Sequence, residues 1–173
     1  RLERHGVVRI IVVPLLISSS SEVMRQFQYV LGLRPDGPWQ EHVHPVRRRA
    51  EAVMTAALDD DPAVAEVLLE RARELSEEPA RESVVLVAHG PTDEDDNARW
   101  LATMNSLGDR LREQGGFRNV VPVTMRDDAP VDVQVEATRR MRDVVRRESA
   151  DGRALVVPLL LANGGIEQKI PQR

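Results

Sequence analysis

The sequence of 173 residues contains no cysteine, which excludes disulfides and thiolate metal sites, so any bound metal must use His, Asp or Glu. It also lacks an apolar run near the roughly 20 residues needed to span a bilayer, which argues against a membrane protein. The formal net charge of −4 argues against a nucleic-acid partner. The composition, with 42% hydrophobic and 30% charged residues, is typical of a globular protein, and the length allows one good core or two small ones.

The chain begins with neither an initiator Met nor a signal peptide. The first residues read as the end of a helix that Gly6 closes, so we expect the chain to begin inside a domain. We also expect the protein to be cytoplasmic.

A central strand is predicted at Val84–Val87, where β-favouring residues without alternation indicate burial on both faces of a parallel sheet. His89 follows at the carboxyl end of this strand, where ligands bind in open α/β sheets. Gly90 and Pro91 break the strand, and an acidic turn then begins a helix whose apolar face carries Trp100, Met104, Leu107 and Leu111. His89 is therefore the main candidate for a functional imidazole, and a simple turn-capping role is the alternative.

A second buried strand is predicted within Val7–Ile17, with Pro14 near its end. The serine run that follows leads into a helix expected at Glu22–Leu31, with Ser20 or Ser21 as its N-cap and Gly32 as its stop. Hydroxyls and free backbone N–H groups at such a turn can bind an anion, or can simply cap the helix. The candidate anion-binding residues are Ser18, Ser19 and Ser20.

The remaining elements complete an α/β pattern. Parallel strands are expected near 8–16, 84–88, 119–124 and 153–161, with helices between them and a further short strand within 47–55. Asp61 and Pro62 are expected to begin one of the helices. His42 and His44, two residues apart in a loop, form a potential metal pair, with no specific role as the alternative.

The last predicted strand repeats the first. Arg9–Ile17 and Arg153–Leu161 share Arg, Val-Val-Pro and Leu-Leu, and they lie 144 residues apart (153 minus 9). A repeat of this quality predicts a duplicated domain. Because each copy holds elements that the other lacks, we expect a fragment of two repeats, residues 1–78 and residues 83–173, cut inside both.

These segments resemble a known family. Val-Ala-His-Gly-Pro at 87–91, the helix with Asn97, and Val-Val-Pro-Leu-Leu-Leu-Ala-Asn-Gly-Gly at 156–165 are similar to the sirohydrochlorin chelatases of the CbiX type, which are class II chelatases. Val-Val-Pro-Leu-Leu-Ile-Ser-Ser-Ser-Ser-Glu at 12–22 resembles the same element in another repeat. The resemblance covers most of the chain.

The resemblance implies duplicated α/β lobes, each with a parallel sheet flanked by helices, that face a cleft for the tetrapyrrole. It implies a lyase that inserts Co²⁺ or Fe²⁺ into sirohydrochlorin or a related tetrapyrrole, towards cobalamin or siroheme. The divalent metal is then a substrate, and no organic cofactor is expected. Pairing between repeats or a homo-oligomer is the expected assembly. The acidic tetrapyrrole side chains would suit the serine run and Gly164 and Gly165.

Among the site residues, the resemblance carries over His89 as metal ligand and catalytic base. Family members commonly have a second His, in whose place this chain has Ile166 in one repeat and Glu22 in the other. We infer Glu167, Asp127 and Glu22 as substitute ligands from their proximity, with Asp128 as a further carboxylate within reach of His89. The missing His leaves a second interpretation, a protein that binds metal or tetrapyrrole without turnover.

Overall fold

The computed structural model describes residues 2–161 and 169–172, and the chain divides into two compact units, residues 1–58 and 59–173. In each unit the described strands pair in parallel and helices accompany them, which confirms the α/β class predicted from the sequence. The repeats predicted at 1–78 and 83–173 were inferred from duplicated sequence, whereas the two units are defined by their compactness. The repeat boundaries therefore stay a prediction.

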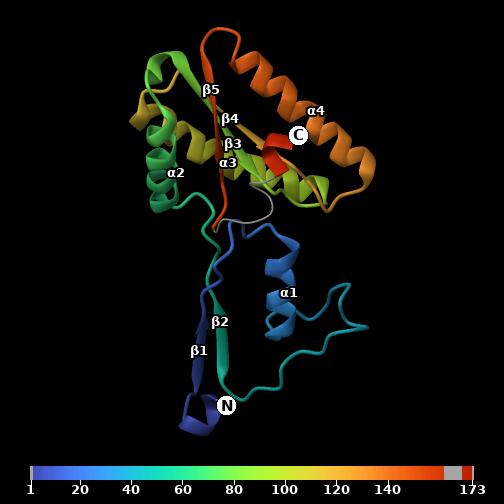
Figure 1. Cartoon of the computed structure of the whole chain (residues 1–173). Coiled ribbons are helices and arrows are strands. Elements are labelled where there is room, and N and C mark those ends of the chain that lie inside the picture. Colours follow the sequence, from blue (N-terminus) through green and yellow to red (C-terminus); the bar gives the residue numbers. More distant parts are fainter. Residues whose placement is uncertain (1, 162–168, 173) are drawn as a thin grey trace. The chain divides into compact units, whose positions relative to one another are not determined.

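The first unit contains a short 3₁₀ turn and a parallel strand pair with one accompanying helix (Figure 1). In chain order its elements are the turn Leu2–His5, β1 (Arg9–Val12), α1 (Glu22–Val30) and β2 (Glu51–Met54). Residue Arg9 lies opposite Glu51 in the register. Ser21 caps α1 by accepting the N–H of Met24 at 3.1 Å, and Gly32 follows the helix with φ +64°, as the sequence predicted.

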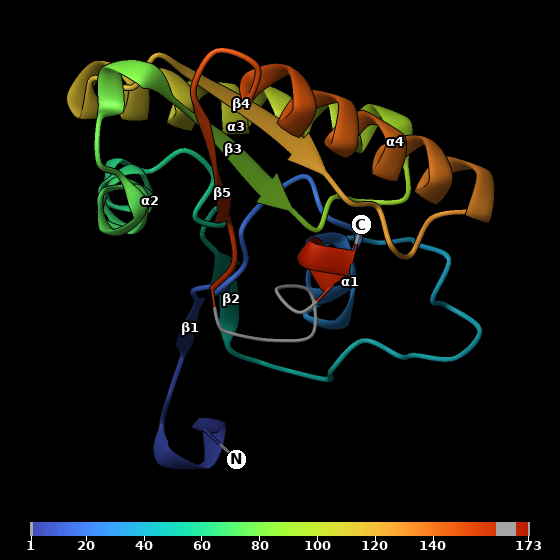
Figure 2. The same ribbon diagram turned by 45° about the horizontal axis from the view of Figure 1, so that its top comes forward.

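The second unit is built on a sheet in which β3 lies between β4 and β5, all parallel (Figure 2). Val84 of β3 is opposite Val120 on one side and Leu155 on the other. In chain order the elements are α2 (Pro62–Leu75), the 3₁₀ turn Pro79–Arg81, β3 (Glu82–Ala88), α3 (Glu94–Gly115), β4 (Asn119–Thr124), α4 (Val131–Glu148), β5 (Arg153–Pro158) and the 3₁₀ turn Ile170–Gln172.

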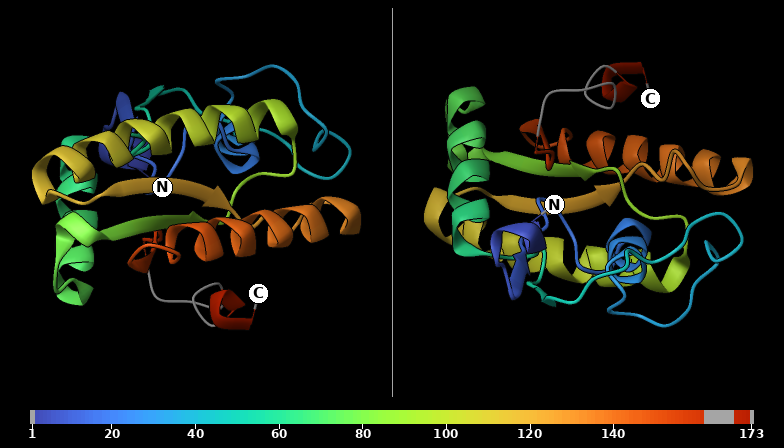
Figure 3. Two further views of the ribbon diagram at one scale, coloured as in Figure 1. Left: turned by 90° about the horizontal axis from the view of Figure 1, so that it is seen from above. Right: turned by 90° about the horizontal axis from the view of Figure 1, so that it is seen from below.

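Helices cover both faces of this sheet, which is why every residue of β3 is buried (Figure 3). Met141 and Val144 of α4 pack against Val85 and Val87 on one face. Helix α3 covers the opposite face, and α2 packs against α3 and β5. The α3 side chains predicted to form its apolar face, Trp100, Met104, Leu107 and Leu111, are all buried.

The strands of the repeated sequence are shorter than expected. β1 covers residues 9–12 rather than 8–16, and β5 covers residues 153–158 rather than 153–161. Pro14 and Pro158 occupy equivalent places in the repeat, and proline has no N–H to continue a ladder. After Pro158 the N–H of Leu159 still donates to the Val87 carbonyl at 2.8 Å, so the chain keeps its direction beyond the strand.

Within the described residues, every helix is too short or too polar to cross a membrane.

Candidate functional site

His89 lies directly after β3, at the carboxyl end of the central strand of its sheet. The strand is fully buried, whereas the His89 side chain is 31% exposed. Gly90 follows with φ +73°, and a Cβ at this position would lie 2.5 Å from the Cβ of Thr124. The turn therefore requires glycine. It places the His89 imidazole at the surface, directly after a strand that lies in the core.

Asp128 is the carboxylate that the fold brings to this imidazole. Its Oδ2 lies 3.3 Å from Nε2 of His89, and its side chain is 75% exposed. The other ring nitrogen, Nδ1, lies 2.9 Å from the carbonyl oxygen of Gly90. Because a carbonyl oxygen can only accept, Nδ1 is the donor in that hydrogen bond, and a neutral ring then presents the Nε2 lone pair to Asp128.

The loop that carries Asp128 follows β4 and is fixed to the His89 turn through the main chain. The N–H of Met125 donates to Ala88 at 2.9 Å, and the N–H of Arg126 donates to the His89 carbonyl at 2.7 Å. Arg126 has a left-handed backbone, with φ +56°, which is uncommon for a residue other than glycine. The sequence analysis named the neighbouring Asp127 and Asp128 as candidate carboxylates and did not identify Arg126 as part of the site.

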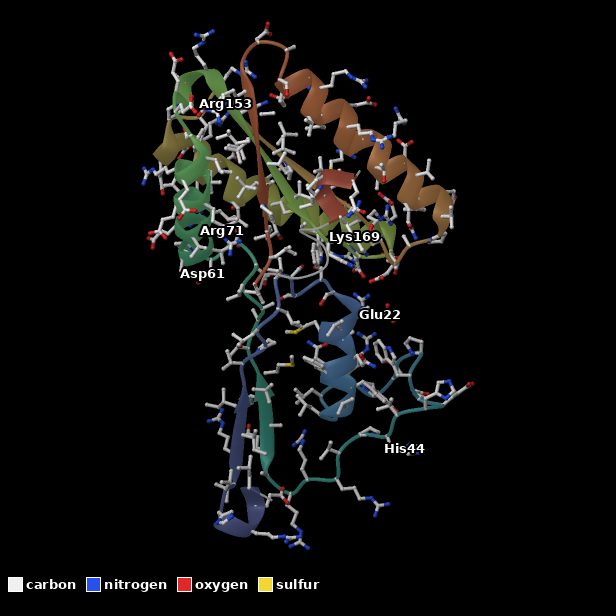
Figure 4. All side chains as sticks on the ribbon, viewed as in Figure 1. Glu22, His44, Asp61, Arg71, Arg153 and Lys169 are labelled. Carbon is white, nitrogen blue, oxygen red and sulfur yellow. The ribbon has the colours of Figure 1, made fainter. Side chains whose placement is uncertain are left out.

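Asp127, the neighbour of Asp128, is engaged elsewhere. Its side chain is 5% exposed, and its Oδ2 lies 2.9 Å from Nζ of Lys169, the lysine labelled in Figure 4. Of the two acids after β4, it is therefore Asp128 that faces His89. Arg126, with its left-handed backbone, directly precedes the two acids, and the residue types alone carry no signal for which of them faces His89.

The predicted residues of the first unit have local roles. The hydroxyl of Ser18 accepts the N–H of Ser20 at 3.1 Å, and the hydroxyl of Ser19 accepts the N–H of Ala57 at 2.9 Å. Glu22 begins α1, and His44 lies in the loop after that helix (Figure 4). Substrate binding by Ser18, Ser19 and Ser20, and metal binding by Glu22, stay predictions.

Gly164, Gly165, Ile166 and Glu167 lie outside the described residues. Among residues 2–161 and 169–172, no group of three or more His, Asp or Glu side chains is arranged to hold a metal ion. Within the described part of the chain, His89 and Asp128 are thus an isolated pair rather than part of a larger cluster of such side chains.

A cavity of about 320 Å³ lies beside this turn, between the first turns of α3 and α4. At its wall Thr124 donates its hydroxyl to Oδ1 of Asn97 at 2.8 Å, and both side chains are buried. The lining residues are Glu94, Asn97, Thr124, Arg126, Asp132, Val133, Glu136, Ala137 and Arg140. The cavity offers a polar recess next to the candidate site, with charges of both signs at its rim.

Comparison with known proteins agrees with the resemblance seen in the sequence. The CbiX family model matches residues 1–75. A search of curated proteins gives no match. Among solved structures, SirB from Bacillus subtilis with Fe³⁺ is similar, with a TM-score of 0.65 and 17% identity over 98% of this chain. This chain covers 60% of that SirB chain.

A second solved structure, DR2241 from Deinococcus radiodurans, has a TM-score of 0.49 and 20% identity. The match covers 88% of this chain and 38% of that one. That protein is described as a multi-domain protein with structural similarity to chelatases and two additional novel domains. The chain thus carries a CbiX family match over residues 1–75, and its fold is similar to that of SirB.

Proposed function

We propose that this protein inserts a divalent metal ion, Co²⁺ or Fe²⁺, into sirohydrochlorin or a related tetrapyrrole, in the formation of cobalamin or siroheme. The observation that carries the proposal is the approach of Asp128 to Nε2 of His89 at the carboxyl edge of the sheet. The CbiX match and the chelatase-like fold support the same class of reaction. The metal is a substrate in this proposal, and no organic cofactor takes part.

The spacing of the two groups suits a cation. Protein nitrogen and carboxylate oxygen ligands lie about 2.1 Å from a bound transition-metal ion such as Zn²⁺, so ligands 3.3 Å apart subtend roughly 104° at such an ion. That angle is compatible with tetrahedral or distorted octahedral coordination. Without a cation or proton between them, the neutral imidazole lone pair and the carboxylate would repel each other.

A pair of ligands also suits transfer rather than storage. Metal insertion requires that the ion leave the protein for the macrocycle, and that the departing pyrrole protons find a base. His89 and Asp128 supply the lone pairs for both tasks, and two protein ligands hold the ion less firmly than three or four. We assign binding of the acidic tetrapyrrole side chains to Ser18, Ser19, Ser20, Gly164 and Gly165.

A second function, binding of metal or tetrapyrrole without turnover, is favoured by a separate observation. The described residues contain no third metal-binding side chain beside His89 and Asp128. Where family members commonly carry a second His, this chain has Ile166 and Glu22. A site with only these two side chains can bind metal or tetrapyrrole without catalysing metal insertion.

One experiment separates the two functions. The protein is incubated anaerobically with metal-free sirohydrochlorin and either Co²⁺ or Fe²⁺, and the absorption spectrum of the macrocycle is followed. Insertion faster than the protein-free reaction supports the chelatase. Spectral changes that saturate at one equivalent of protein, without turnover, support the binding protein. No interaction with either substrate would contradict both.

A further inference from the structure

Arg126 joins the two loops of the candidate site through its side chain. Its Nε donates to the carbonyl of Pro91 at 3.1 Å, and one terminal nitrogen donates to the carbonyl of Thr92 at 2.6 Å. The other terminal nitrogen forms an ion pair with Glu94, in the first turn of α3. One guanidinium thus binds three residues of the segment that follows His89, namely Pro91, Thr92 and Glu94.

The main chain of Arg126 also connects these two loops, through two backbone hydrogen bonds. Its N–H donates to the His89 carbonyl at 2.7 Å, and its carbonyl accepts the N–H of Ala129 at 3.0 Å. Asp128 lies inside the turn closed by this second bond. Side chain and backbone of one residue therefore determine where the Asp128 carboxylate stands relative to the imidazole.

Burial and strain indicate that this arrangement is tightly specified. The Arg126 side chain is 8% exposed, whereas Glu94 is 77% exposed, so the pair is asymmetric and the arginine is the enclosed partner. A buried guanidinium must have acceptors for its donors, and here two carbonyls and a carboxylate supply them. The left-handed backbone persists in a non-glycine residue only where the surroundings enforce it.

We infer that Arg126 is a positioning residue, which holds the Asp128 loop against the His89 turn and so sets the separation of the two groups. The inference rests on the proposed function for its purpose, but its geometry is independent of turnover. Lysine cannot replace it, because one ammonium group lacks the planar fork that reaches Pro91, Thr92 and Glu94 together. Arg126 acts through Asp128 and need not contact the metal or the macrocycle.

The test is a double-mutant cycle between Arg126 and Asp128, read from the imidazole ¹⁵N resonances of His89 at one fixed, mildly alkaline pH without metal. Arg126→Gly removes the side chain and keeps the left-handed backbone accessible, so it separates the two contributions. Asp128→Asn removes the carboxylate charge. Arg112→Ala, an exposed arginine of α3 paired with Asp109, controls for loss of a surface guanidinium.

Arg126→Gly should shift the His89 resonances towards their Asp128→Asn positions, and the double variant should match Asp128→Asn alone. Arg112→Ala should leave the resonances unchanged. Wild-type resonances in Arg126→Gly, or shifts of the two single variants that simply add, would overturn the inference. If Arg126→Gly does not fold, Arg126→Lys and Glu94→Gln enter the same cycle with the same criterion.

The same variants in a Co²⁺ titration distinguish this inference from the proposed function. If the protein binds metal through His89 and Asp128, Arg126→Gly should weaken Co²⁺ binding about 10- to 100-fold. Non-additive resonance shifts without insertion activity in the wild type would leave the positioning role intact and reject the chelatase. Insertion activity that Arg126→Gly leaves unchanged would support the chelatase and reject the positioning role of Arg126.

Discussion

Glu82 and Arg153 face each other across β3 and β5, with Oε1 of the glutamate 3.0 Å from Nη1 of the arginine. The Glu82 side chain is only 2% exposed. Burial alone would raise the pKa of its carboxyl group. Hydrogen bonds from the Ser76 hydroxyl and the N–H groups of Glu77 and Glu78, with the charge of Arg153, outweigh burial and lower that pKa below its usual value.

This pair predicts acid sensitivity. The folded-state pKa of Glu82 lies below its unfolded value, so its contribution to stability is present above the unfolded pKa and is lost as pH falls through the folded pKa. We expect the free energy of unfolding to decrease below about pH 4.5 and to decrease less steeply in Glu82→Gln. Urea unfolding at a series of pH values measures this slope.

The control is Glu66→Gln, an exposed residue of α2, which should keep the wild-type slope. Glu148 provides a second, independent case: burial opposes ionisation, but bonds from Ser83, Arg147 and Asn119 lower its pKa. Identical pH slopes in wild type, Glu82→Gln and Glu148→Gln would show that these carboxylates do not carry the acid sensitivity.

The repeated strand predicts a matched pair of core variants. Leu155 and Ile11 occupy equivalent positions of the repeat, yet Leu155 is 5% exposed and Ile11 is 63% exposed. Leu155→Ala should cost about 2 to 5 kcal/mol of unfolding free energy, because it opens a cavity at a buried position of β5. Ile11→Ala should change it by no more than about 0.5 kcal/mol. Equal losses in the two variants would mean that the first strand is buried in solution.

The Gly90 turn predicts a second matched pair. Gly90 and Gly116 both have positive φ, +73° and +68°, but a Cβ at Gly90 would collide with Thr124 while one at Gly116 meets nothing within 4 Å. Gly116→Ala should therefore cost only the left-handed backbone term of about 1 to 2 kcal/mol. Gly90→Ala should cost more and should also displace His89, as thermal unfolding and the His89 resonances would report. A smaller loss for Gly90→Ala than for Gly116→Ala would contradict the close contact with Thr124.

Local patterns were sufficient to predict the framework of the site. The unbroken apolar run of β3 predicted a central buried strand, and His89 at its end predicted an imidazole at the ligand-binding edge of the sheet. Trp100, Met104 and Leu107 follow helical spacing, and all are buried in α3. These features depend on residues that are close together in the sequence, so a single sequence is sufficient to predict them.

Tertiary placement could not be predicted in the same way. Asp127 and Asp128 are identical in type and adjacent, yet Asp128 meets His89 while Asp127 meets Lys169, in a loop where the preceding Arg126 has a left-handed backbone. The repeated strands likewise share a pattern, but the burial of Leu155 depends on helices that come from elsewhere in the chain. Arg126 itself was missed because a buried arginine has no distinctive local sequence signal.

The most direct test of the account is the initial rate of metal insertion in variants of the paired ligands, measured anaerobically with sirohydrochlorin and Co²⁺ or Fe²⁺. His89→Ala should lower the rate by at least about 100-fold, because it removes the side chain proposed as both metal ligand and base. Asp128→Asn should lower it less, and His44→Ala, a loop histidine, should leave it unchanged. All three proteins should keep the wild-type unfolding transition. Equal rates for wild type and His89→Ala would contradict the assignment of this site.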